Sequence, residues 1–274
     1  VTGALVDSSM FGATFPRLDV ATTVGGGDIR VDTMGSFANL DPAIVTNNTR
    51  VAGMLNGTVD AETTIRKYVA GVTVDSIDVA GRVDLGPSTI GELAIDSAVV
   101  DGQYANRQGQ IRQLAIAGAD VNVTAQGAIA LNETGSSNLT VHAESAALER
   151  IGEIIGQPIK GAAIIDATVT GNARDLRAAG MLTGSNIGHG ANEALTVSST
   201  FSAVMPNLAP AETRVEASTM ATFLEVGGQT INQLTADTTY IPAGPGENGG
   251  RVDFKAVAQQ GVRQLAAGGS VVFD

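Results

Sequence analysis

The sequence of 274 residues contains no cysteine and no tryptophan, and aromatic residues make up only 4% of it. The absence of cysteine excludes disulfide bonds, cysteine-ligated zinc and thiol catalysis. Because bulky aromatic side chains dominate many sandwich cores, their scarcity predicts a smooth apolar surface built from aliphatic residues. The hydrophobic share of 43% is nevertheless high enough for a folded protein.

Positive charge is scarce as well, with 16 Lys and Arg against 28 Asp and Glu and a net charge of −12. Nucleic acid would be repelled on average and no basic cluster offers an exception, so we expect no nucleic-acid partner. No stretch approaches the ~18 apolar residues of a membrane span. The chain starts at Val1 in mid-pattern without a leader, so we expect one segment, residues 1–274, of a larger anchored protein.

Strict alternation of apolar and polar residues is the main pattern that is present. In residues 120–132, "DVNVTAQGAIALN", the odd positions from Val121 to Leu131 are apolar or glycine and most even positions are polar. Such alternation is typical of a β-strand with one apolar and one polar face. Similar runs recur from residue 29 to residue 273, separated by turn signals such as Gly86-Pro87 and Asp101-Gly102. They predict roughly fourteen strands in an antiparallel meander.

One segment breaks the two-residue period. In residues 145–156, Leu148, Ile151, Ile154 and Ile155 have helical spacing, which predicts a short amphipathic helix. Ser145 is the expected N-cap, and Gly156 followed by Pro158 is a stop signal.

A sheet with one apolar face must cover that face. A two-sheet sandwich, a closed barrel and an open trough all satisfy the alternation. Glycines inside strands, among them Gly53, Gly57, Gly81 and Gly127, favour strong twist or bending. Strand spacing drifts, which disfavours a β-solenoid.

A resemblance to a known family narrows these alternatives. The stretch "AQGAIAL" is followed by "SSNLTVHAESAALERIGEIIGQPIKGAAIIDATVTGNARDLRAAGMLTGSNI". The order of alternating strand, short Leu/Ile helix and glycine-marked strands, with Gly161, Gly171 and Gly180 at the glycine positions, resembles the AsmA-like proteins, most closely the TamB-type (translocation and assembly module) members. The resemblance covers about 70 residues and is weaker over the rest.

The resemblance implies an all-β fold, a long curled antiparallel sheet (a β-taco or groove) with one short amphipathic helix. It implies a non-enzymatic segment that shields phospholipid acyl chains in a hydrophobic groove between the inner and outer membranes. The protein would lie in the periplasm, anchored to the inner membrane through a missing N-terminal segment. The alternative is a scaffold for outer-membrane protein assembly or secretion that pairs with an Omp85-type barrel.

The lipid-binding groove is predicted from the apolar positions of the alternating strands. These residues are Val51, Leu55, Val59, Ile77, Val79, Val83, Val121, Val123, Ile129, Leu131, Leu139, Val141, Ile165, Val169, Leu182, Leu195, Val197, Phe201, Val215, Phe223, Leu234, Val252 and Phe254.

Residues for other chemistry are few. His142 and His189 are the only histidines, and we expect both on a solvated surface rather than in a metal site. Residues 25–28, Gly-Gly-Gly-Asp, precede a predicted strand and not a helix, so they predict a hairpin turn and not a phosphate loop. No spacing of Ser, His, Asp or Glu suggests a catalytic constellation. We therefore expect no enzyme activity, no metal and no cofactor.

Overall fold

The computed structural model describes residues 1–10, 12–244 and 249–273. It confirms an all-β fold, a single long antiparallel sheet that is curled and not closed. The strands are β1 (Thr2–Met10), β2 (Ala13–Gly25), β3 (Asp28–Leu40), β4 (Gly53–Ile65), β5 (Ile77–Leu85), β6 (Ser88–Ile90), β7 (Leu93–Ile95), β8 (Ser97–Ala105), β9 (Gln108–Gly118), β10 (Val121–Ala130), β11 (Ser137–Ser145), β12 (Ile159–Asn172), β13 (Asp175–His189), β14 (Asn192–Pro206), β15 (Arg214–Val226), β16 (Gln229–Pro242), β17 (Gly250–Gln260) and β18 (Arg263–Phe273).

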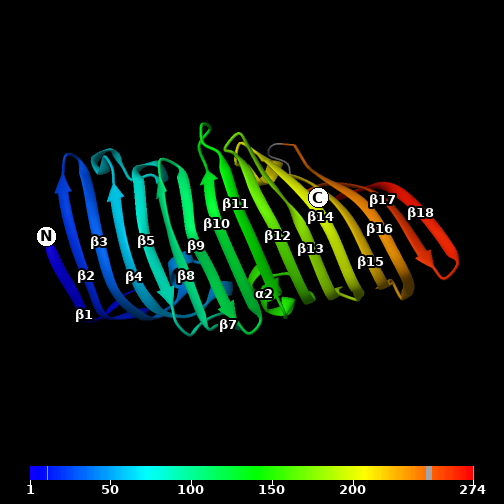
Figure 1. Cartoon of the computed structure of the whole chain (residues 1–274), viewed down its shortest axis with the longest axis horizontal. Helices are drawn as coiled ribbons and strands as arrows, with labels where there is room; N and C mark the ends of the chain where they lie inside the picture. Colours follow the sequence, from blue (N-terminus) through cyan, green and yellow to red (C-terminus); the bar gives the residue numbers. More distant parts are fainter. Residues whose placement is uncertain (11, 245–248, 274) are drawn as a thin grey trace.

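The strands are connected as a meander. Each strand pairs with the next along the chain, except around the short hairpin β6–β7. There β5 pairs directly with β8, and β6 and β7 pair with each other. This hairpin extends the sheet by pairing β6 with the first residues of β4. Figure 1 shows the result, a ribbon with β1 at one end and β18 at the other.

Both α-helices lie at the same ends of the strands. The helix α1 (Pro42–Thr46) and the 3₁₀ turn η1 (Thr49–Val51) link β3 to β4, and α2 (Leu148–Ile155) links β11 to β12. Figure 1 shows α2 at the lower edge, and it contacts η1, the turn after α1. The turns η2 (Tyr68–Ala70), η3 (Val74–Ser76) and η4 (Pro210–Glu212) lie in other connections.

The structure confirms the predicted helix but corrects its N-terminus. Ser145 is the last residue of β11, and the N-cap is Ala147, which forms no side-chain cap. Gly156 ends the helix in the left-handed conformation, as the stop signal predicted. Arg150 ties α2 to its surroundings through ion pairs with Glu92 in the β6–β7 turn and Asp120 in the β9–β10 turn.

The predicted hairpin at residues 25–28 is confirmed, since β2 ends at Gly25, Gly26 and Gly27 have positive φ, and β3 begins at Asp28. Four strands were not predicted, namely β1, β2, β6 and β8. In β2, Pro16 and Arg17 interrupt the alternation, and the pairing with β3 shifts register between Thr14 and Arg17.

Glycines inside the strands let neighbouring backbones approach closely. A Cβ atom on Gly35 would lie 2.2 Å from the carbonyl oxygen of Arg17, and one on Gly180 would lie 2.2 Å from that of Asp166. No real side chain tolerates such a distance, so these positions require glycine. This close approach fits the twist and curl of the sheet.

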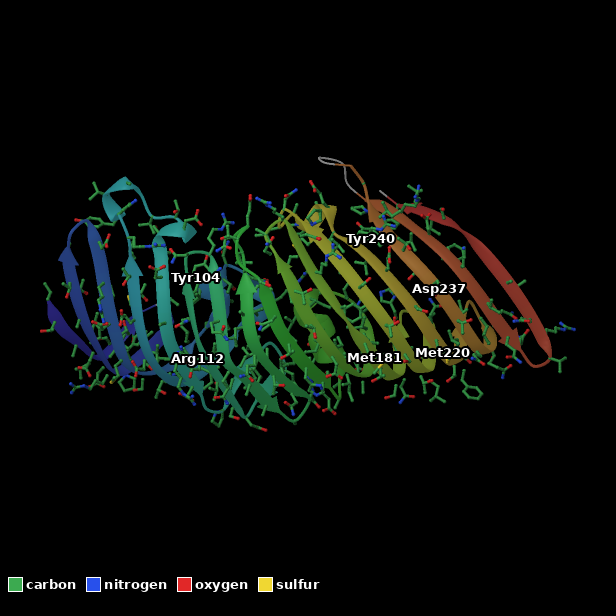
Figure 2. The ribbon with its side chains drawn as sticks, turned by 45° about the horizontal axis from the view of Figure 1, so that its top comes forward. Tyr104, Arg112, Met181, Met220, Asp237 and Tyr240 are labelled. Atoms are coloured by element: carbon green, nitrogen blue, oxygen red, sulfur yellow. The ribbon has the colours of Figure 1, made fainter. Side chains whose placement is uncertain are left out.

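The molecule is essentially one layer thick. Its accessible surface is 15678 Å², whereas a compact protein of this mass exposes about 11,000 Å². Among the described residues, no large side chain is fully buried. Figure 2 shows side chains standing on both sides of the ribbon. The fold therefore leaves both faces of the sheet accessible along most of its length.

Candidate functional site: a continuous apolar face

Directly opposed residues in adjacent strands point to the same face of a sheet, so the pairing register defines rows across the ribbon. The central row crosses every strand except the short β6 and β7. It consists of Leu5, Leu18, Gly35, Val59, Val83, Val100, Leu114, Ala125, Val141, Ala167, Gly180, Phe201, Ala217, Thr238, Phe254 and Gly269.

A flanking row on the α2 side starts at β3 and lies on the same face. Its members are Phe37, Gly57, Leu85, Ala98, Ile116, Val123, Ala143, Ile165, Leu182, Ser199, Thr219, Ala236, Ala256 and Ala267.

The flanking row on the other side has two parts. The first is Gly3, Val20, Thr33, Ala61, Gly81, Gly102, Ile111 and Gly127. The second is Leu139, Val169, Ala178, Ala203, Val215, Tyr240, Val252 and Val271. We call the surface formed by the three rows the apolar face.

The apolar face contains no charged residue, although the chain has 44 Lys, Arg, Asp and Glu. Its few polar members are hydroxyl residues, and several of them form hydrogen bonds within the sheet. Ser199 and Thr219 share a hydrogen bond of 2.8 Å, and the hydroxyl of Thr238 donates to the carbonyl oxygen of Ala217 at 3.4 Å. The surface is therefore uninterrupted by charge from β1 to β18.

The opposite face, which we call the polar face, carries charges instead. Arg30 pairs with Glu62 across β3 and β4 at 2.6 Å, and Arg112 pairs with Asp101 across β9 and β8 at 2.6 Å. Within β5, the hydrogen bond from Arg82 lowers the pKa of Asp84, and the burial that would raise it has a smaller effect. The two pairs that cross between strands discourage a slip in register.

Side chains on the apolar face are partly shielded by one another but are not sealed. Val121 and Leu139 are buried, at 7% and 9% exposure, whereas Val100 is 44% exposed. The one apolar cluster of buried residues comprises Ala194, Ala221 and Leu224, with Val197, Ile231 and Leu234 packed against it. No second sheet covers these rows within the described ranges, so the face is an open apolar surface rather than half of a dry core.

The structure brings most of the predicted groove residues onto this face. Nineteen predicted residues lie in the three rows or continue the same alternation toward the strand ends. They are Leu55, Val59, Ile77, Val79, Val83, Val121, Val123, Ile129, Leu139, Val141, Ile165, Val169, Leu182, Val197, Phe201, Val215, Leu234, Val252 and Phe254.

Four predicted groove residues lie elsewhere. Val51 belongs to η1, and Leu131 follows the end of β10. Leu195 and Phe223 are on the polar face, at 48% and 59% exposure, because the alternation shifts at this point in both strands. Their neighbours Ala194 and Leu224 point to the apolar face instead, where they pack together.

Several members of the apolar face were not predicted. Leu5, Leu18 and Val100 lie in strands that were missed, β1, β2 and β8. Tyr240 in β16 was not among the predicted groove residues, and it stacks on Phe273 with ring centroids 6.0 Å apart. The register with neighbouring strands, which no single-strand pattern contains, is the signal that identifies them.

Neither histidine belongs to the three rows of the apolar face. Nδ1 of His142 is 2.7 Å from a carboxylate oxygen of Asp166 on the polar face, where Arg112 and Thr124 line the same shallow hollow. His189 is the last residue of β13. Within the described part of the chain, no cluster of three or more His, Asp or Glu could hold a metal ion.

No protein-family model, curated protein or solved structure matches this chain. No described helix is both long and apolar enough to cross a membrane.

Proposed function

We propose that this chain is a non-enzymatic lipid conduit, in which the apolar face shields the acyl chains of phospholipids in transit. The observation that carries the proposal is the central row, which runs from Leu5 to Gly269 without a charged residue. At the ~4.8 Å spacing of neighbouring strands, this row is about 70 Å long. A single acyl chain spans about 15 Å, half of a ~30 Å bilayer core. The apolar face is thus a path and not a pocket for one lipid.

The energetics of lipid movement favour such a path. A diacyl lipid has on the order of 30 methylenes, and exposing each to water costs ~0.8 kcal/mol, so free crossing would cost more than ~20 kcal/mol. Contact with aliphatic side chains removes much of this cost. Because the face offers no charge or metal that would hold one headgroup, it supports sliding better than tight binding.

The resemblance to TamB-type proteins supports the same proposal and adds a location. In that setting the chain would lie in the periplasm and belong to a protein anchored in the inner membrane, with phospholipid as the cargo. Native mass spectrometry of the purified chain tests the proposal. We expect adducts with the masses of phospholipids, and a clean apo mass after gentle extraction in lipid-rich conditions would contradict it.

A second candidate is a scaffold for outer-membrane protein assembly. The observation that favours it is β18, in which every residue is exposed and which pairs only with β17 among the described strands. A free strand edge can add a strand from another protein. Tight binding to an Omp85-type barrel, abolished by proline at Ala266 in β18 while lipid adducts persist, would favour the scaffold.

A further inference from the structure

A crease crosses β13 to β16 near their α2-side ends. In these strands two successive residues point to the polar face, namely Ser185-Asn186, Leu195-Thr196, Thr222-Phe223 and Asn232-Gln233. The residues on either side of the crease return to the apolar face, because Ala194 and Val197 lie in one cluster with Leu224, Ala221, Ile231 and Leu234. An uninterrupted two-residue alternation would have placed Leu195 and Phe223 on the apolar face.

Leu195 and Phe223 are the only apolar residues displayed by this crease, and both are strongly exposed, at 48% and 59%. They occupy facing positions between the pairs Ala194–Leu224 and Thr196–Thr222. Phe223 has a φ of +48°, which is unfavourable for a bulky side chain. The fold therefore gives up apolar burial and accepts backbone strain to present this pair outward. Strain of this kind concentrates where a surface has a function.

Two carboxylates border the exposed pair. Glu193 and Glu225 are direct partners across β14 and β15, two residues from Leu195 and Phe223 respectively. Like charges placed opposite each other destabilise a sheet. Lys160 pairs with Glu193, whereas Glu225 forms no ion pair with any part of the chain that the structure describes. An added cation at Glu225 would therefore be favourable.

We propose that Leu195, Phe223, Glu193 and Glu225, which we call the crease patch, dock a cationic amphipathic segment of a partner protein. The apolar pair supplies the central contact, and the carboxylates pair with lysine or arginine at its border, the arrangement typical of a small interface with an aromatic anchor. Charge decides the class of partner, because an anionic membrane surface would be repelled by Glu193, Glu225 and a net charge of −12. The inference is independent of the lipid-conduit proposal.

The test uses a synthetic Leu/Lys amphipathic helix of about 18 residues, five turns long, labelled for fluorescence anisotropy. We expect Phe223→Ser and Glu225→Lys each to weaken its binding by about tenfold. Phe223→Trp is expected to retain binding. Met181→Ser is the matched control, because Met181 is an apolar residue of the polar face with 46% exposure (Figure 2) and lies away from the crease.

The position of the bound synthetic helix is determined by photo-crosslinking, with p-benzoylphenylalanine introduced at position 223 or at position 201. Crosslinking to the peptide from position 223, and not from position 201 on the apolar face, supports the proposal. Unchanged affinity in Phe223→Ser, with the circular dichroism of the native protein, overturns it. Preferential binding of a Leu/Glu helix or of phosphatidylglycerol vesicles at the crease patch also overturns it.

Discussion

The substitution Val100→Asp is expected to obstruct lipid movement along the apolar face while the sheet stays folded. Val100 lies in the central row between Val83 and Leu114, in the middle of the ribbon. Because its side chain is already 44% exposed, the substitution removes only part of the ~1.5–3 kcal/mol that full burial of valine contributes. We expect a loss of about 1 kcal/mol in the free energy of unfolding.

The effect on lipid transfer should be larger. An acyl chain that passes over residue 100 must contact a carboxylate, and an aspartate in a hydrocarbon environment costs roughly 3 kcal/mol. Since each 1.36 kcal/mol on a barrier is a factor of ten in rate, the rate of transfer should fall on the order of 100-fold. Val272→Asp is the matched control, because Val272 is 70% exposed and pairs with Arg251 on the polar face.

The assay is transfer of a fluorescent phospholipid from donor to acceptor vesicles, with circular dichroism and urea unfolding to verify the fold. We expect Val100→Asp to be folded and nearly inactive and Val272→Asp to transfer lipid at the native rate. Equal rates for the two variants would refute the reasoning. Unfolding of Val100→Asp would also refute it, because it would show that the apolar face is a structural core.

Three further predictions concern the stability of the fold. Gly180→Ala should lower the free energy of unfolding by about 2–4 kcal/mol, because the new Cβ would collide with a neighbouring backbone, whereas Gly3→Ala, with no atom within 4 Å of the new Cβ, should be nearly neutral in urea unfolding. Asp84→Asn should lower the thermal midpoint slightly at neutral pH. Because Arg82 lowers the pKa of Asp84 in the folded state, this difference should vanish as the pH falls below the ordinary value of 3.8 and through the lowered pKa. Arg150→Ala should accelerate amide hydrogen exchange in α2 without changing the thermal midpoint by more than about 1 °C, because Glu92 is exposed and Asp120 is only half-buried.

The sequence was sufficient to predict the apolar face over most of its length. Alternation with a period of two assigns each residue of a regular strand to one face, and this held for runs such as Val121–Ile129 and Ile165–Val169. The sequence also predicted the end of the helix at Gly156, because a glycine in the left-handed conformation commonly terminates a helix.

Prediction failed where the backbone leaves the regular pleat. Leu195 and Phe223 fit the alternation of β14 and β15, but the crease places two consecutive residues on the polar face and reverses the assignment beyond it. Nothing in a single strand marks such a shift, because it is set jointly by neighbouring strands. Ser145 was mistaken for a helix cap because pairing with Ala163 keeps it in β11.

The alternation of apolar and polar residues also could not predict that the sheet is open. A sandwich, a barrel and a trough place apolar residues at the same strand positions, and they differ only in what faces them. The resemblance favoured the trough, and the single-layer ribbon with its accessible surface of 15678 Å² agrees with it. The central claim is that phospholipid acyl chains occupy the apolar face.

Photo-crosslinking from positions 201 and 223 tests most directly whether lipid occupies the apolar face. Both are phenylalanines in adjacent strands, but Phe201 lies in the central row of the apolar face and Phe223 lies on the polar face with 59% exposure. With p-benzoylphenylalanine at each position, irradiation in the presence of phospholipid vesicles should yield lipid adducts from position 201 and none above background from position 223. Equal labelling at both positions, or labelling from position 223 alone, would contradict the account.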